Sequence, residues 1–237
     1  MYRYRVVVGW MLVIGVVAAC APATPTAAPS RTALVSELRN AVELHAADST
    51  DWQAAAEGQT LAAGGGVRTG ENARARVDIS DGTILRLTAN TEFELTTLSP
   101  EADNPVTKWT LNAGHIFIQV TKALGVGSFE VDTPNGVATV RGSLMGVEYH
   151  PANAHMIITC LEGECTLTQP ATGQSTTLTA GQQTGIRGLG NDPRPAGTID
   201  SVRLGEWAQF FPEVLTIVTT ITPGPPPTAT LVFTPTP

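Results

Sequence analysis

The sequence lacks the basic clusters and catalytic motifs by which many classes of protein are recognised. Charged residues make up 15% of its 237 residues, and the formal net charge is −7. This acidic balance, without any cluster of lysine or arginine, excludes nucleic acid as a partner. The chain has no Gly-x-Ser-x-Gly or His-Glu-x-x-His motif, which excludes two common hydrolase classes. Gly64-Gly65-Gly66 is not followed by Lys-Ser or Lys-Thr, so it indicates a flexible turn and not a phosphate-binding loop.

The chain also lacks an apolar run long enough for a membrane-spanning helix at its N-terminus. Arg3 and Arg5 precede an apolar run from Val6 to Val17, whereas a spanning helix needs ~20 residues. A positive start, a short apolar run and small residues are typical of a secretory signal peptide. The last four residues, Val17-Ala18-Ala19-Cys20, resemble the lipobox of bacterial lipoproteins. The resemblance implies that residues 1–19 are removed and that Cys20 is lipidated; the alternative is an uncleaved anchor with an incidental thiol.

Both ends of the chain have compositions that do not form a core. Residues 20–32 contain Cys20 and a Pro/Thr/Ala linker, and residues 222–237 form a Pro/Thr-rich tail. The tail is either disordered without a role or a semi-rigid, O-glycosylated stalk. Between them, residues 33–190 are predicted to form one domain, followed by an extension at 191–221. Low charge, many β-branched residues and 23 glycines predict an all-β domain of about a dozen short strands, arranged as a sandwich or a jelly-roll-like stack.

Alternation of apolar and polar residues predicts the strands and fixes the register of one hairpin. Residues 73–79 alternate with period two, and residues 83–87 follow at once. A three-residue loop, 80–82, sets Val77 opposite Leu85 and keeps the apolar residues on one face, whereas a two-residue loop would set Val77 opposite Arg86. Further strands are predicted at 92–97, 106–111, 115–120, 129–133, 137–141, 144–150, 156–160, 165–169, 176–178 and 183–186. Turn residues separate them at Asn90, 112–114, 134–136, Gly142 and 180–181.

One helix is predicted near the C-terminus, at residues 201–211. Its apolar residues, Leu204, Trp207, Ala208 and Phe211, recur at helical spacing, and we expect this aromatic face to pack on the sheet. Ser201 is a suitable cap, and Pro212 ends the helix. By contrast, the pattern of residues 35–45 fits either a helix or a strand.

An ordered series of short motifs along residues 34–186 resembles the FecR domain. The motifs are mostly turns, and they begin at Trp52. They are 57–61, 67–70, Asp81 and Gly82 within 81–87, 90–91, Thr133 and Pro134, Arg141 and Gly142 within 140–143, Glu162 and Gly163 within 161–164, and 180–182.

The resemblance implies an extracytoplasmic all-β domain without catalytic residues, in which residues 39–45 form a strand. In the family's named members this domain senses an outer transport protein and controls a sigma factor through a cytoplasmic segment. This chain has Gly64-Gly65 where members usually carry Gly-Asp, and Ser143 where they usually carry Thr. We also expect no cytoplasmic segment before the signal peptide, so that only the extracytoplasmic module carries over.

Apart from Cys20, the chain has two cysteines, Cys160 and Cys165. Both belong to the predicted domain, which we expect in a compartment where disulfides persist. If Ile158 and Leu167 share a face across a hairpin, the two cysteines lie opposite each other. We therefore expect a disulfide that staples a small hairpin, and the alternative is two packed thiols. The spacing of four residues excludes a redox Cys-x-x-Cys motif.

Two histidines form a candidate metal or pH-sensitive site. Apolar parity puts His150 and His155 opposite each other on the outer face, with Glu148 nearby. A weak metal site is one hypothesis, and exposed loop residues are the other, because zinc normally takes four ligands.

Acidic and aromatic residues have mainly structural interpretations. The carboxylates that a glycoside hydrolase would need are expected to point to solvent or lie in turns. They are Asp78, Asp81, Glu92 and Glu94. Trp52, Trp109 and Trp207 are expected in or beside the core, and an exposed one would be a candidate sugar platform.

Together these features predict a non-enzymatic binding or sensory module outside the cytoplasm. We expect it to be anchored at the cell surface through lipidated Cys20, with an envelope protein or glycan as partner and no cofactor. A structural envelope protein without a signalling role is the first alternative, and an enzyme is the second.

Overall fold

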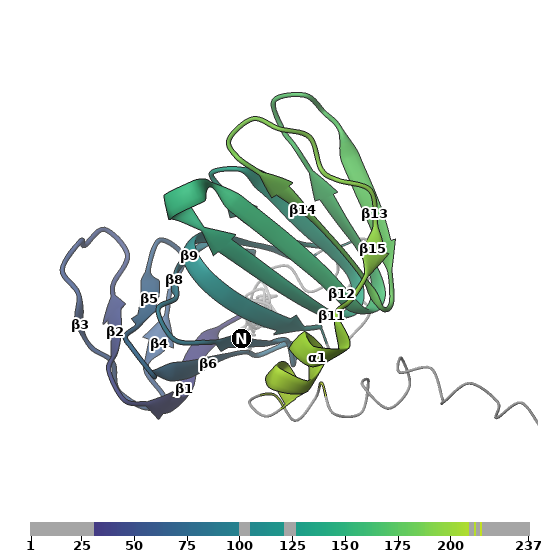
Figure 1. The fold of residues 1–237 in the computed structure, drawn as a ribbon. Helices are drawn as coiled ribbons and strands as arrows, with labels where there is room; N and C mark the ends of the chain where they lie inside the picture. Colours follow the sequence, from purple (N-terminus) through teal and green to yellow (C-terminus); the bar gives the residue numbers. More distant parts are fainter. Residues whose placement is uncertain (1–30, 100–104, 121–126, 209–210, 212–213, 215–237) are drawn as a thin grey trace, which may run out of the picture.

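The computed structural model describes residues 31–99, 105–120, 127–208, 211 and 214, and these residues are mainly strands (Figure 1). The all-β class predicted from composition is therefore confirmed. The strands are β1 Ala33–Arg39, β2 Val42–His45, β3 Gln53–Ala54, β4 Thr60–Leu61, β5 Gly66–Thr69, β6 Arg74–Ile79, β7 Ile84–Leu87, β8 Glu92–Leu98, β9 Val106–Gln119, β10 Ser128–Thr133, β11 Gly136–His150, β12 His155–Thr168, β13 Ser175–Thr179, β14 Gln182–Arg187 and β15 Gly197–Thr198. A 3-10 helix, Pro151–Asn153, joins β11 to β12, and the helix α1 is Ser201–Ala208.

Several predictions concern residues outside these ranges. They are the signal peptide, Cys20, the linker up to residue 30, the tail, and residues 209–210 of the predicted helix. None of the helices in the described ranges has the length and apolarity needed to cross a bilayer.

The strands form one hydrogen-bonded sheet that three long strands divide into two layers. The first layer has the order β3-β2-β5-β8-β9-β10-β11-β12-β13, and the second has the order β4-β1-β6-β7-β9-β11-β12-β14-β15. Strands β9, β11 and β12 belong to both layers because each half of the strand pairs with different neighbours. In Figure 1 these long strands cross the centre, with β1–β8 on one side and β13–β15 on the other.

Three predicted turns are wrong, because they are bends within these long strands. Residues 112–114 lie inside β9, Gly142 lies inside β11, and 161–164 lie inside β12. The register between β11 and β12 shifts at Arg141 and Leu144, as at a bulge. Glycine and asparagine mark bulges as well as turns, so the residue types alone did not separate a bend from a reversal. Gly114 has φ +93°, and a Cβ there would lie 2.4 Å from Oγ1 of Thr91.

The predicted register of the β6–β7 hairpin is confirmed. Val77 pairs with Leu85, and the loop 80–82 has Gly82 at φ +91°. The helical alternative for residues 35–45 is wrong, since they lie in β1 and β2 on either side of Asn40 at φ +58°. The strand implied for 39–45 is therefore interrupted by a turn at residues 40–41.

The space between the layers is filled by one apolar core to which both layers contribute. Burial of each large side chain contributes about 1.5–3 kcal/mol to folding. The largest side chains with almost no exposure are Trp109, Phe93, Phe129, Leu61, Leu85, Leu87, Leu95, Leu111, Ile116, Ile118, Met145 and Met156.

A second apolar cluster lies on the outer face of the second layer, under α1. Phe117 of β9 packs against Trp207 and Phe211 with ring centroids 5.0 and 4.1 Å apart. The other members of the cluster are Leu144, Leu161, Leu204, Ala208 and Val214. The helix thus covers the middle of this face, between β7 on one side and β12 on the other.

The disulfide between Cys160 and Cys165 is present, with the Cα atoms 5.6 Å apart. The predicted hairpin around it is wrong, because both cysteines belong to β12 and pair with Met145 and Val140 of β11. The disulfide therefore bridges the bend of a continuous strand. Ile158 faces the core both in a hairpin and in a bent strand, which is why parity did not distinguish the two.

Candidate functional site

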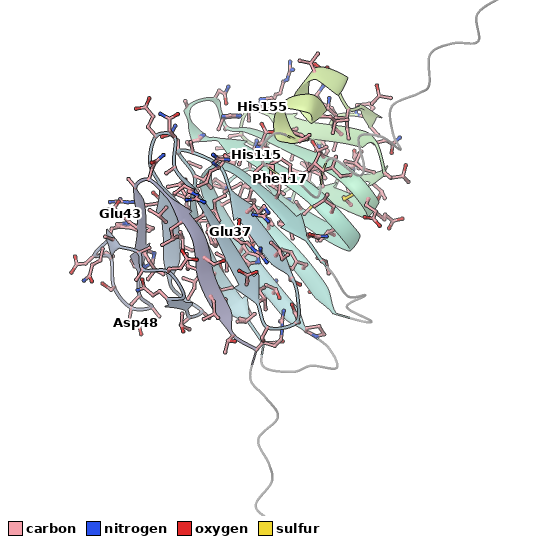
Figure 2. All side chains as sticks on the ribbon, turned by 90° about the horizontal axis from the view of Figure 1, so that it is seen from below. Glu37, Glu43, Asp48, His115, Phe117 and His155 are labelled. Carbon is pink, nitrogen blue, oxygen red and sulfur yellow. A yellow bond between two sulfur atoms is a disulfide. The ribbon has the colours of Figure 1, made fainter. Side chains whose placement is uncertain are left out.

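The outer face of the second layer carries three parallel rows of side chains across β9, β11, β12 and β14. They follow from the strand registers. The rows are Phe117–Gly146–Thr159–Gln183, His115–Glu148–Ile157–Gly185 and His150–His155–Arg187. Figure 2 shows His155, His115, Phe117 and Glu37 following one another across this face.

The carboxylate of Glu148 lies between two histidines on this face. Its Oε1 is 3.7 Å from Nε2 of His115, and its Oε2 is 3.6 Å from Nε2 of His150. The side chain of Glu148 is only 9% exposed, whereas that of His150 is 54% exposed. The ring of His115 also packs against Trp207, at 5.2 Å between centroids. The second row therefore connects the polar part of the face to α1.

The predicted placement of His150 opposite His155 is confirmed, with Glu148 beside them. Their ring centroids are 6.3 Å apart. Within the described ranges, no group of three or more histidine, cysteine or acidic side chains is arranged to hold a metal ion.

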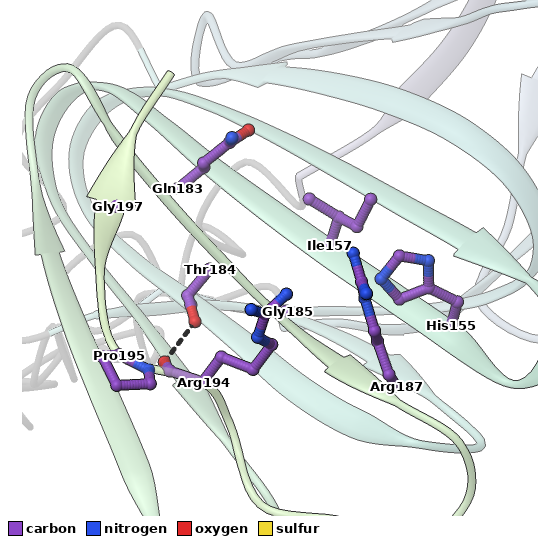
Figure 3. Close-up of a pocket in the computed structure, with 9 residues that line it drawn as sticks. All are labelled: His155, Ile157, Gln183, Thr184, Gly185, Arg187, Arg194, Pro195 and Gly197. Carbon is purple, nitrogen blue, oxygen red and sulfur yellow. Dashed lines mark hydrogen bonds between the residues drawn. The ribbon is translucent and has the colours of Figure 1, made fainter. Parts of the chain in front are cut away.

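A groove of about 280 Å³ lies at the β14 end of the same face (Figure 3). The outward side chains of β12 and β14 form its floor, and the segment from Arg194 to Gly197 forms its rim. Its lining residues are His155, Ile157, Gln183, Thr184, Gly185, Arg187, Arg194, Pro195 and Gly197. Sequence reasoning missed most of them, because residues 188–197 carry no periodic pattern and the two arginines are not adjacent in sequence.

At the opposite end of the face, arginines are held by acidic residues. Oε1 of Glu37 accepts a hydrogen bond from Arg76 at 2.7 Å, and its Oε2 accepts one from Arg86 at 2.6 Å. Arg76 also pairs with Asp78. Burial alone would raise the pKa of Glu37, but the hydrogen bonds and charges of Arg86 and Arg76 outweigh it and lower this pKa. These arginines belong to an ion-pair network within the sheet.

The turn motifs implied by the family resemblance have structural contacts. Asp81 pairs with Arg31, and its Oδ1 accepts a hydrogen bond from the backbone N–H of Thr83 at 2.9 Å. Oγ1 of Thr133 accepts hydrogen bonds from the backbone N–H groups of Asn135 and Gly136, at 3.2 and 3.1 Å. These bonds fix the loop of the β10–β11 hairpin, which contains Pro134.

The other two motifs meet at a shared bend. In the register of β11 with β12, the backbone of Arg141 lies opposite that of Glu164, and the backbone of Leu144 lies opposite that of Glu162. Gly142 and Gly163 therefore lie between these pairs, where β11 and β12 pass from one layer to the other; Gly163 has φ +81°. Motifs that are far apart in sequence thus build the same corner of the sheet.

The acidic residues considered for hydrolysis do not form a facing pair. Asp78 and Asp81 belong to β6 and its hairpin in the second layer, and Glu92 and Glu94 to β8 in the first. Asp78 accepts a hydrogen bond from Ser36 as well as pairing with Arg76. Their positions favour the predicted role as surface carboxylates.

The three tryptophans within the described ranges occupy different environments. Trp109 is fully buried in the core, as predicted, and Trp207 is 7% exposed in the cluster under α1. Trp52 is half-buried, with the guanidinium of Arg68 4.5 Å from its ring centroid and the ring of His45 at 4.5 Å. The ring of Trp52 is therefore engaged by its own chain.

Comparison with known proteins supports the resemblance for the central part of the chain. The family model described as FecR protein matches residues 66–166. The match starts at the first residue of β5 and ends within β12, so it contains all three bends. No curated protein matches this chain.

Two crystal structures of a putative anti-sigma factor from Parabacteroides distasonis have a similar fold. The identities are 17% and 19%, and the TM-scores are 0.51 and 0.50. Each similarity covers 61% of this chain and 64% of the other. At this identity the likeness concerns the fold alone.

Proposed function

We propose that this protein is a non-enzymatic, extracytoplasmic binding and sensory module of FecR type, tethered to the membrane as a lipoprotein. The match of residues 66–166 to the FecR model carries the proposal. The structural neighbours are described as a putative anti-sigma factor, which favours a regulatory role over a catalytic one. The engagement of Asp78 and Asp81 by arginines and serine agrees with a non-enzymatic module.

The proposed tether rests on the N-terminal residues. Arg3, Arg5, the apolar run and Val17-Ala18-Ala19-Cys20 together fit a lipidated N-terminus. Metabolic labelling with an alkyne fatty acid tests it. Wild-type protein and the neighbouring control Ala21→Ser should carry the label in the membrane fraction, and Cys20→Ala should not. A label that persists in Cys20→Ala, or no label in the wild type, would contradict lipidation.

The sensory role is tested by deleting the gene and restoring it in the native host. We expect a limited set of transcripts to change on deletion and to recover on complementation. If transcription stays constant while the envelope becomes permeable to a dye, the protein has a structural role instead. The Pro/Thr-rich ends, which have the composition of spacers, are the observation that keeps this second function in consideration.

A further inference from the structure

The groove at the β14 end of the outer face combines positive charge with a hydrogen-bond acceptor. Arg187 lies at the end of β14, and Arg194 lies on the rim; both are exposed. Within the described ranges neither guanidinium forms an ion pair. In Figure 3 the side chain of Arg194 extends toward Gly185, and that of Arg187 runs beside His155 toward Ile157.

The backbone of Arg194 is fixed by three hydrogen bonds. Its N–H donates to the carbonyl of Gly185 at 3.1 Å. Its carbonyl accepts from Oγ1 of Thr184 at 2.5 Å and from Oγ1 of Thr176 at 3.1 Å. The rim is therefore attached to both β13 and β14, and the guanidinium starts from a fixed point. Such preorganisation reduces the entropy that is lost when a ligand binds.

One residue that lines the groove, Gln183, has a buried amide oxygen that accepts no hydrogen bond in the described part of the chain. Oε1 of Gln183 is shielded from solvent and has no donor within hydrogen-bond distance. A buried amide oxygen without a donor costs free energy. When the Gln183 amide turns into the groove, a ligand hydroxyl group would supply this donor, while the ligand's anionic group would be bound by Arg187 and Arg194.

We propose that this groove binds a small hydroxylated anion with the chemistry of an acidic sugar, through Arg187, Arg194 and Gln183. Its volume of about 280 Å³ lies at the lower end of the range for small-molecule pockets, which suits a single sugar ring. Gly185 contributes no side chain to the floor of the groove. A side chain does not fit at this position, because a Cβ would lie 2.5 Å from the carbonyl oxygen of Met156. The inference rests on the proposed binding function and adds the class of ligand.

Most of the groove lies outside the part of the chain that carries the family match. His155 and Ile157 lie within residues 66–166, and the other lining residues lie beyond residue 166. The proposed ligand would therefore contact mainly residues C-terminal to the family match.

Titration of the full-length protein in detergent with D-glucuronate, measured by calorimetry, tests the proposal. D-Glucose serves as the neutral analogue and acetate as the anion without hydroxyl groups. We expect glucuronate to bind at least about tenfold more tightly than either, because both its charge and its hydroxyl groups are recognised. An oligosaccharide that ends in glucuronate distinguishes the source: tighter binding than the free sugar indicates a glycan terminus, and weaker binding indicates a free acidic sugar.

Variants assign the binding to the groove. Arg187→Gln and Arg194→Gln should each weaken glucuronate binding by about tenfold or more, since each removes charge-assisted hydrogen bonds. Gln183→Leu should weaken glucuronate but leave acetate unchanged. Arg39→Gln, at an exposed arginine of β1, is the matched control and should bind as the wild type does. The midpoint of thermal unfolding of each variant reports whether the fold is intact.

Three results would overturn the proposal. The first is no saturable binding of glucuronate up to about 10 mM, which is about tenfold above a dissociation constant of about 1 mM. The second is equally tight binding of glucose, and the third is an equal loss of glucuronate binding in Arg39→Gln. These results leave the proposed function untouched if Cys20 is acylated and the transcripts respond to deletion. The two proposals therefore fail separately.

Discussion

The two ends of the second layer's outer face both carry arginines, but they differ in how the charges are satisfied. At the β6–β7 end, Arg76 and Arg86 share the carboxylate of Glu37. At the β14 end, Arg187 and Arg194 have no carboxylate partner among the described residues and border a groove. Positive charge alone therefore does not identify a ligand site on this face. The difference predicts that the first pair supports the fold and that the second pair is available to a ligand.

The largest effect is expected where the two ends meet, at Phe117. This residue pairs with Arg86 of β7 on one side and with Gly146 of β11 on the other. Phe117→Ala removes a ring that is 2% exposed and packs on Trp207 and Phe211. We expect a loss of about 3 kcal/mol in the free energy of unfolding, measured by urea denaturation.

The same experiment tests whether the two ends belong to one folding unit. A single transition, shifted to lower urea, is expected for Phe117→Ala, because one core extends through both layers. Leu189→Ala, at a leucine that is 73% exposed, is the control and should change stability by less than about 0.5 kcal/mol. Two separate unfolding transitions would contradict this expectation, because they would show that the two ends of the face unfold independently.

The next effect concerns the disulfide in the bend of β12, near the groove end. Replacing both Cys160 and Cys165 by alanine should cost about 2 kcal/mol, because the cross-link closes only a short loop. Hydrogen exchange should rise in β14, which pairs with β12 from His155 to Cys160. Exchange in β6 and β7 should stay unchanged below the unfolding transition. An equal rise of hydrogen exchange in β14 and in β6 and β7 would show that the disulfide does not stabilise the groove end selectively.

A smaller and more specific test compares arginines at the two ends. Arg86→Gln should destabilise the protein by about 1 kcal/mol, since the Arg86 side chain is 14% exposed and its loss removes one of the two partners of Glu37. Arg187→Gln, at the exposed end of β14, should change stability by less than about 0.5 kcal/mol. Thermal unfolding at low ionic strength measures both. Equal losses would mean that Arg187 also has a structural role.

Much of the fold could be predicted from the sequence where strands are short and joined by tight loops. The β6–β7 hairpin is an example, because Val77 and Leu85 can share a face in only one register. Prediction failed at Gly142 and at 161–164, where the same residue types form bulges. Distinguishing a bulge from a turn requires knowing whether the next segment pairs with the same neighbour, and that is a long-range property of β9, β11 and β12.

The groove was less predictable than the fold, for a related reason. His155 was identified because it lies opposite His150 in one strand pair. Arg187 and Arg194 converge only because the rim returns to β14 through the backbone bond from Arg194 to Gly185. Residues 188–197 contain glycine, proline and asparagine without periodicity, so the sequence alone contained no signal for that return.

The smallest expected effect comes from a carboxylate whose pKa shifts in the direction opposite to that of Glu37. Burial raises the pKa of Asp132 in β10, with a lowering contribution from Lys108 and a raising contribution from Glu130. A raised pKa means that the folded state binds protons more tightly than the unfolded chain does, so ionised Asp132 opposes folding at neutral pH. Asp132→Asn should therefore raise the unfolding midpoint slightly at pH 7, and the gain should vanish as pH falls through the pKa of the folded-state carboxyl.

Glu37→Gln should behave in the opposite way. Because the pKa of Glu37 is lowered, its stabilising contribution is present at pH 7 and is lost as pH falls through its folded-state pKa. Midpoints measured from pH 7 to pH 3 should thus converge on the wild type from above for Asp132→Asn and from below for Glu37→Gln, and convergence from the same side would refute the assigned contrast.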